Sequence, residues 1–213
     1  MIDRRRATVG TLARRALQAI MESRINYRLS YAIDLACPIA LGWQRSRGSS
    51  VWTTDLLAFC LGGAIFTFVE YALHRWVFHA QGTFAATAHR IHHRSPADPM
   101  ALPCLSSAVV SLALWLVLTR LPGVAVASFL ASGVLSGYFV YATLHHVHHS
   151  TRSTAVPFRW LRRSRVTHAV HHSFPDKNFG VTTSLWDHVF GTHQERGTVS
   201  FRHSLSSPDR AAH

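Results

Sequence analysis

Residues 123–149 read GVAVASFLASGVLSGYFVYATLHHVHH, a long apolar run that ends in four closely spaced histidines. Its first part, Gly123–Leu144, contains no charged side chain. A helix of about 20 apolar residues crosses the roughly 30 Å hydrocarbon layer of a bilayer. This stretch therefore predicts a transmembrane helix that carries its histidines at one end.

Three further apolar stretches extend this prediction. Met100–Thr119 and Val51–Tyr71 are each long enough to span a bilayer. Leu29–Trp43 is shorter and contains Asp34 and Pro38, so it is either a fourth span or a helix that lies in the membrane interface. The predicted fold class is all-α, an integral membrane protein with about four transmembrane helices.

Within the run that opens this section, Gly133 and Gly137 are four residues apart and have Ser132 and Ser136 beside them. Small residues at this spacing allow two membrane helices to approach closely. The pair predicts tight helix packing and does not by itself indicate chemistry.

The composition of the 213 residues fits a membrane protein better than a nucleic-acid-binding protein. Lys plus Arg (22) against Asp plus Glu (10) give a formal net charge of +12, yet only 15% of residues are charged and 48% are hydrophobic. We therefore expect no nucleic-acid partner. Cys37, Cys60 and Cys104 lie far apart in apolar stretches, which argues against a disulfide framework and a cysteine-based zinc finger.

The distribution of basic residues predicts the orientation. Except for Arg45, Arg47 and Arg120, all Lys and Arg fall in residues 1–28, 75–103 or 150–213. Loops rich in Lys and Arg stay on the cytoplasmic side. With four spans, both terminal segments and the segment between the second and third spans would lie in the cytoplasm.

The regions outside the spans are short. Residues 1–28 combine arginines with apolar residues at helical spacing, which predicts an amphipathic helix on an anionic bilayer. No short apolar core follows these arginines, so a cleavable signal is not expected, and a transit peptide is the less favoured alternative. Residues 29–195 are assigned to the membrane domain with its histidine-rich cap, and residues 196–213 to a polar tail.

Twelve of the 16 histidines form four groups, each at or just beyond the end of a predicted span on the cytoplasmic side. The groups are His74 and His79; His89, His92 and His93; His145, His146, His148 and His149; and His168, His171 and His172. The other four, His188, His193, His203 and His213, belong to no group and are expected to be structural or surface residues.

The spacing within the groups suggests metal binding. In HxxHH the imidazoles occupy i, i+3 and i+4, so we expect all three to point at one centre. His145 and His149 are also one turn apart. His74 and His79 would diverge by about 140° on a straight helix, so one of them is expected to leave the helix or follow its end. His146 and His148 stay ambiguous, because a run of HHVHH cannot all face one way.

About ten imidazoles exceed the coordination of one ion, so two metal ions are predicted. The groups contain no acidic residue, unlike carboxylate-rich di-iron bundles, and an all-nitrogen site suits either iron or zinc. Glu70 precedes His74 by one turn and is a candidate acceptor for the second N–H of that imidazole. An interfacial carboxylate without this role is the alternative.

These motifs resemble those of the fatty acid hydroxylase and sterol desaturase superfamily of membrane oxygenases. The similarity runs in order through Glu70-Tyr71-x-x-His74-Arg75-x-x-x-His79, His89-x-x-His92-His93, Tyr141-x-x-x-His145-x-x-x-His149 and His168-x-x-His171-His172, and then through the run from Asn178 to Thr192. It covers roughly residues 51 to 195. Within the superfamily, residues 89–103 and the Tyr-x-x-x-His motif look most similar to the fatty acid 2-hydroxylase branch.

The resemblance implies four membrane helices beneath a cytosolic cap, and a di-iron centre, with zinc possible in a purified or substituted form. It assigns as metal ligands, and so as the catalytic centre, His74, His79, His89, His92, His93, His145, His149, His168, His171 and His172. The family's third motif usually has a further histidine where this chain has Ser150. The implied reaction is O2-dependent hydroxylation of a lipid acyl chain.

Electrons are expected from a separate ferredoxin or cytochrome b5-like protein with its reductase, because the first 50 residues are too few for a fused cytochrome b5 domain. Arg159, Arg162, Arg163 and Arg165 would attract an acidic partner or an anionic headgroup, or else act as positive-inside anchors. The alternatives are a sterol or carotenoid desaturase or hydroxylase of the same superfamily and a non-catalytic metal-binding membrane protein such as a transporter. A haem-binding cytochrome would need paired histidines within the spans, and the long apolar runs have none.

Overall fold

The computed structural model describes residues 12, 15–46, 51–98, 101–120, 126–150 and 158–195, and this part of the chain is helical, without a strand. The elements are α2 (Arg24–Ser46), α3 (Trp52–Leu73), the π-helix η1 (His74–Phe78), α4 (Phe84–Arg94), α5 (Cys104–Leu118), α6 (Ala127–His149), α7 (Arg159–Ser173) and α8 (Leu185–Val189). The all-α prediction is confirmed. Residues 1–11, 13 and 14 of the predicted N-terminal amphipathic segment, residues 121–125 and the predicted tail lie outside the described residues.

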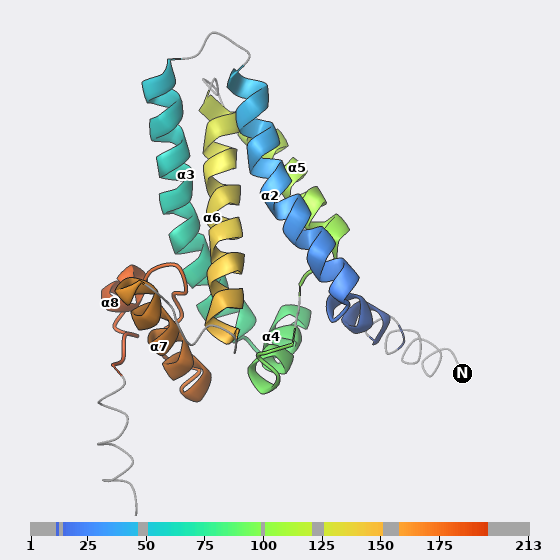
Figure 1. The fold of residues 1–213 in the computed structure, drawn as a ribbon, viewed down its shortest axis with the longest axis vertical. Helices are drawn as coiled ribbons and strands as arrows, with labels where there is room; N and C mark the ends of the chain where they lie inside the picture. The colour runs from blue at the N-terminus through green and yellow to red at the C-terminus, as the bar shows by residue number, and fades with distance from the viewer. Residues whose placement is uncertain are drawn as a thin grey trace, which may run out of the picture.

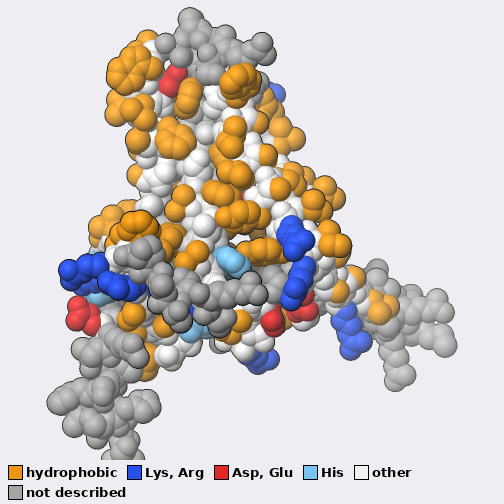
Figure 2. Space-filling model, viewed as in Figure 1, with side chains coloured by type: hydrophobic (Ala, Val, Ile, Leu, Met, Phe, Trp, Pro, Cys, Tyr) orange, Lys and Arg blue, Asp and Glu red, His pale blue; other side chains and the backbone are white. Residues whose placement is uncertain are grey.

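The long helices α2, α3, α5 and α6 run side by side, and α4, α7 and α8 gather at one end of them (Figure 1). Helix α6 packs against both α3 and α2, and α2 packs in turn against α5. Hydrophobic side chains cover the visible face of the long helices, and most of the visible Lys and Arg lie near the end that carries α4 and α7 (Figure 2). The arrangement therefore separates an apolar shaft from a polar end.

Two helical segments are long and apolar enough to cross a membrane: Trp52–Phe78 and Ala127–His149. Large apolar side chains on α3 point outward, with Leu57 70% and Leu61 56% exposed. Leucines repeated along one outward face are unfavourable in water and favourable against lipid. The chain is therefore membrane-associated, with α3 and α6 as the candidate spans.

Helix α5 is shorter than the span predicted for Met100–Thr119, because it begins only at Cys104. Pro103 precedes it, and a residue before proline avoids the helical conformation, so Leu102 stays outside the helix. Asn26 on α2 holds this non-helical segment: its amide nitrogen donates to the carbonyl oxygens of Ala101 and Leu102, and its side-chain oxygen accepts from the backbone N–H of Cys104.

Glycines set the distance between α3 and α6. A Cβ atom added to Gly62 would lie 2.2 Å from the carbonyl oxygen of Leu130, and one added to Gly133 would lie 2.1 Å from that of Phe59. The ring of Phe66 occupies the space beside Gly137 in the same way. The close packing predicted from Gly133 and Gly137 is confirmed, and the helix that they contact is α3.

Candidate metal centre

Ten histidines form two compact clusters at the end of the shaft where α4 and α7 lie. In each cluster, one ring nitrogen from every histidine lies within 4.8 Å of the corresponding nitrogens of the others. The first histidine cluster consists of His74, His79, His89, His93 and His171, and the second of His92, His145, His149, His168 and His172. The structure thus brings together all ten histidines that the sequence singles out as ligands.

The two HxxHH motifs are divided between the clusters, so the expectation that all three imidazoles of a motif face one centre is wrong. His89 and His93 on α4 enter the first cluster, whereas His92 enters the second. Helix geometry explains the division, because positions i and i+4 differ by only about 40° around the axis, while i+3 and i+4 differ by about 100°.

The second motif, on α7, divides in the opposite sense. His168 and His172 enter the second cluster, and His171 enters the first. Each of these two helices therefore gives a pair one turn apart to one cluster and a single histidine to the other. Neither helix can move without disturbing both clusters.

His74 and His79 reach the same cluster because the chain between them is a π-helix. Helix α3 ends at Leu73, η1 runs from His74 to Phe78, and His79 follows it with φ −94° and ψ 1°. A π-helix repeats through i→i+5 hydrogen bonds, so residues five apart come to lie on one side. The expectation that one of the pair follows the helix end is confirmed, and the widened turn is the local reason.

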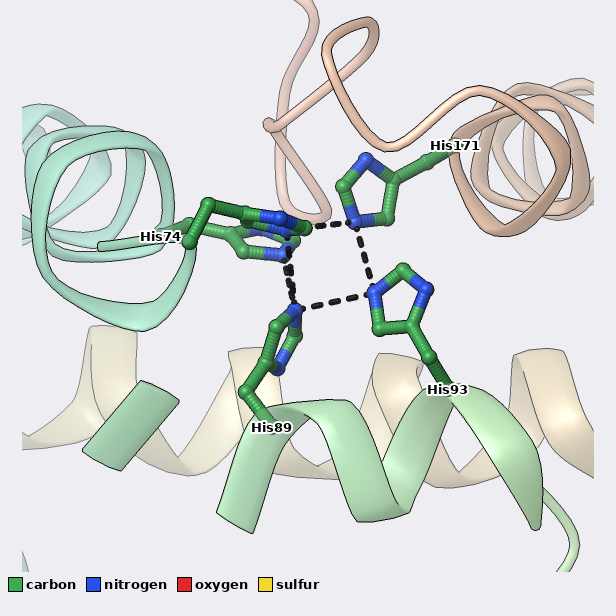
Figure 3. A group of neighbouring side chains, drawn as sticks. His74, His89, His93 and His171 are labelled. Atoms are coloured by element: carbon green, nitrogen blue, oxygen red, sulfur yellow. Dashed lines mark hydrogen bonds between the residues drawn. The ribbon is translucent and has the colours of Figure 1, made fainter. Parts of the chain in front are cut away.

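Four members of the first histidine cluster face one another from η1, α4 and α7, as Figure 3 shows for His74, His89, His93 and His171. The Nε2 atom of His89 lies 3.1 Å from that of His74, 3.0 Å from that of His79 and 2.9 Å from that of His93. The Nε2 atom of His171 lies 3.2 Å from those of His79 and His93. His89 is therefore the central member of the cluster.

The second histidine cluster is equally tight. The Nε2 atom of His168 lies 2.9 Å from that of His149 and 3.2 Å from that of His172. The Nε2 atoms of His92 and His145 are buried and have no hydrogen-bond partner among the described residues. Buried polar atoms without a partner are costly, and a bound cation would satisfy them.

Both clusters fit a metal ion by the spacing of their donors. Imidazole nitrogens about 2.1 Å from an ion lie about 3.0 Å apart when they subtend a right angle, and about 3.4 Å apart in a tetrahedron. The observed separations of 2.9–3.2 Å match the right angle. Five nitrogen donors at this spacing suit a five- or six-coordinate transition metal better than a four-coordinate structural zinc.

The protonation state also suits a metal. Burial and the neighbouring His93 lower the pKa of His79 to about 4, and burial with His93, His149 and His79 lowers the pKa of His172 to about 3. Burial likewise lowers the pKa of His89, followed by the proximity of His74, His93 and His79. These imidazoles are neutral near pH 7, which is the state that binds a metal.

Backbone carbonyls orient two histidines of the first cluster. The Nδ1 atom of His74 lies 2.5 Å from the carbonyl oxygen of Phe179, and that of His171 lies 2.7 Å from that of Lys177. A carbonyl only accepts, so each Nδ1 carries the proton and each Nε2 lone pair faces the cluster. The suggestion that Glu70 accepts from His74 is wrong, because Phe179 takes that position and Glu70 binds the backbone of Val181 and Thr182.

Several histidines lie outside both clusters. His148 is buried with its Nε2 3.1 Å from the hydroxyl of Ser164, and the His146 ring lies 5.7 Å from that of Tyr27. His188 and His193 stack on each other, with ring centroids 4.0 Å apart. The carbonyl of Ser150, where the superfamily usually has another histidine, accepts from Arg165.

Comparisons with known proteins identify the family of the chain. The fatty acid hydroxylase family profile matches residues 59–192. The dihydroceramide fatty acyl 2-hydroxylase FAH2 of Arabidopsis thaliana is 35% identical over 144 residues, covering 64% of this chain and 60% of the relative. The ceramide very long chain fatty acid hydroxylase SCS7 of Saccharomyces cerevisiae is 35% identical over 153 residues, covering 63% of this chain and 37% of the relative.

A solved structure of full-length scs7p, in which only the hydroxylase domain is visible, has the same fold, with a TM-score of 0.69 and 24% identity over 84% of this chain and 70% of that one. The chain thus spans 60% or less of the length of the curated relatives described here. The profile match covers most of the chain and includes both histidine clusters. The protein belongs to the fatty acid hydroxylase family.

Proposed function

We propose that the protein is a membrane-bound di-iron oxygenase that hydroxylates a lipid acyl chain with O2 and external electrons. The observation that carries this proposal is the pair of five-imidazole clusters at the shared end of α3 and α6. The names of the relatives, fatty acyl 2-hydroxylase and ceramide fatty acid hydroxylase, favour an acyl chain over a sterol or carotenoid. They also favour the carbon next to the carbonyl as the position of hydroxylation.

The ten clustered histidines are the proposed metal ligands. Iron bound there would supply the O2-activating redox chemistry that hydroxylation of an unactivated C–H bond needs, whereas zinc has no redox chemistry of its own. The residues of the chain have the tasks of holding neutral imidazoles in place and excluding water. His74, His168 and His171 are at most 2% exposed, which supports the second task.

The substrate is proposed to enter sideways from the bilayer. Helices α3 and α6, the two candidate membrane segments, lead directly into the centre, through His74 after α3 and through His145 and His149 at the end of α6. An acyl chain that lies along the apolar shaft could therefore reach the clusters without leaving an apolar environment. A transporter would instead place its ligands near the middle of the spans.

The electron donor is proposed to be a separate acidic protein. Arg159, Arg162 and Arg163 are exposed on α7, the helix that also carries His168, His171 and His172. A positive face beside the centre would guide a negatively charged carrier to it. The same arginines would also hold this end of the molecule against anionic lipid headgroups.

The test of the proposed activity is lipid analysis by mass spectrometry. We expect a host that expresses the chain with a ferredoxin or cytochrome b5 donor to accumulate acyl chains that have gained one oxygen atom, with fragments that place it next to the carbonyl. The same host without the chain is the control. An unchanged lipidome from a preparation that is folded, metal-loaded and supplied with donor would contradict the hydroxylase proposal.

The proposed topology has four spans, a cytosolic cap, and both termini in the cytoplasm. It is supported by the positions of the basic residues and by α2 and α5, which pack beside the two candidate spans. Helix α5 has 15 residues and is about 22 Å long, shorter than the roughly 30 Å hydrocarbon layer. If it crosses the membrane, neighbouring residues must complete the span at its ends. Helix α2 has 23 residues and contains Pro38.

Reporter fusions test this topology. Alkaline phosphatase fused after Gly48 or Arg120 is expected to be active, because these points face away from the cytoplasm, and phosphatase fused after Ser150 or Glu195 is expected to be inactive. Green fluorescent protein at the same four points should give the reciprocal pattern. Active phosphatase after Ser150 would reverse the orientation, and inactive phosphatase after Gly48 would argue that α2 does not span.

A further inference from the structure

The segment Lys177–Thr182 lies against the first histidine cluster, with the Phe179 ring beside His74, His79 and His171 and with two backbone carbonyls that accept hydrogen bonds. The carbonyls of Lys177 and Phe179 accept from the Nδ1 atoms of His171 and His74, as described above. These histidines come from α7 and from the start of η1, so one short segment fixes ligands from two separate helices. The position of this segment therefore sets the direction of two Nε2 lone pairs.

Two buried carboxylates hold that segment through four consecutive backbone N–H groups. Asp187 accepts from Phe179 at 2.8 Å and from Gly180 at 2.9 Å. Glu70 accepts from Val181 at 2.5 Å and from Thr182 at 3.1 Å. Asp187 is completely buried and Glu70 is 5% exposed, so water does not compete for these hydrogen bonds.

Further contacts keep the carboxylates in place. The hydroxyl of Thr182 donates to Glu70, and the hydroxyl of Thr192 donates to Asp187 at 2.7 Å. A Cβ atom added to Gly180 would lie 2.0 Å from the carbonyl oxygen of Thr183 and 2.9 Å from the carboxylate of Asp187, so only glycine fits there. The contact is therefore a close, specific fit of carboxylates against backbone.

The second histidine cluster lacks this support. The Nδ1 atoms of His168 and His172 are buried and have no hydrogen-bond partner among the described residues. The carbonyls that orient ligands of the first cluster belong to a segment held by two carboxylates from outside both clusters. The two clusters thus differ in what surrounds them although each has five imidazoles.

We propose that Glu70 and Asp187 are positioning residues for the first histidine cluster, and that they set its metal affinity through the Lys177–Thr182 backbone without touching the ion. The proposal rests on the proposed metal centre. Groups that orient metal-bound histidines typically change metal affinity by about 10- to 100-fold. Loss of either carboxylate should therefore weaken one ion by about that factor and leave the other unchanged.

The test uses the purified full chain in detergent, loaded with Co²⁺ and titrated with a chelator, with retained metal measured by mass spectrometry and the Co²⁺ absorption bands as a second readout. Glu70→Gln and Asp187→Asn should each release one of two ions at a chelator concentration about 10- to 100-fold lower than the wild type does. Thr182→Val removes only the hydroxyl donor and should shift the release by less.

Asp55→Asn is the matched control. Asp55 is also a buried carboxylate on α3, but it lies 15 residues before Glu70, about 22 Å along the axis. It should release both ions as the wild type does. If Glu70→Gln does not accumulate, Asp187→Asn and Thr182→Val carry the test.

Double variants identify the affected cluster. In a His92→Ala background the remaining ion occupies the first cluster, and Glu70→Gln should weaken it. In a His89→Ala background the remaining ion occupies the second cluster, and Glu70→Gln should have no effect. Equal weakening of both ions, or the same weakening by Asp55→Asn, would mean a purely structural role and overturn the proposal. A wild-type chain that binds fewer than two ions would instead overturn the metal centre itself.

Discussion

Replacing His89 by alanine is expected to lower the production of hydroxylated lipid by more than about 100-fold and to reduce the bound metal from two ions to one. His89 has the central position in the first histidine cluster, with its Nε2 within 3.1 Å of those of His74, His79 and His93. Loss of a group that is hydrogen-bonded to a metal ligand typically lowers metal affinity or activity by about 10- to 100-fold. Loss of a ligand itself should lower them by more.

The measurement is metal content together with lipid analysis in cells that contain the same amount of protein. His146→Ala is the control, because His146 lies on α6 next to the proposed ligand His145 but belongs to neither cluster. This variant should retain both ions and its activity. A His89→Ala protein that retains two tightly bound ions would contradict the assignment of His89, and equal loss of activity in His146→Ala would contradict the division of the histidine run on α6.

The second large effect is expected on stability, from Gly62→Ala. The added methyl group would lie 2.2 Å from the carbonyl oxygen of Leu130 and 2.9 Å from the backbone nitrogen of Val134. Backbone atoms cannot rotate away as a side chain can, so α3 and α6 would have to separate. Overpacking typically costs about 1–3 kcal/mol, and we expect a loss at the upper end of this range in the free energy of unfolding.

Gly63→Ala provides a neighbouring control on the same helix. A Cβ atom there would lie 3.9 Å from the carbonyl oxygen of Gly133, which is an ordinary contact. Because alanine favours a helix over glycine by about 1 kcal/mol, this variant should be neutral or slightly more stable. Thermal unfolding in detergent compares the two, and equal melting temperatures would argue against the close approach of α3 and α6.

The histidine spacing in the sequence predicts which residues come together, because imidazoles on successive turns at the ends of apolar helices are brought to the same end of the helix bundle. The structure gathers all ten, and their binding of metal stays a prediction. The spacing does not predict how the ten histidines are divided between the two clusters. That partition depends on how α4 and α7 are rotated relative to one another, and either partition is compatible with HxxHH.

The support around the first cluster is also not predictable from the sequence. The groups that orient His74 and His171 are backbone carbonyls, which every residue possesses, so no residue type marks them. The run from Asn178 to Asp187 resembles the ending of the superfamily, and that resemblance was the only available signal. The sequence marks Glu70 by its place one turn before His74, but its partners Val181 and Thr182 are distant in sequence and predictable only from the fold.

The division of the HxxHH motifs has a consequence for biosynthesis. The first cluster needs His171 as well as histidines from residues 74–93, and the second needs His92 as well as histidines from residues 145–172. Neither can be completed until the ribosome has made the chain as far as α7 and that helix has folded back onto α4. If each cluster binds an ion as proposed, neither ion can obtain its full set of five imidazoles before α7 is made, so complete loading of the centre would follow the folding of that helix.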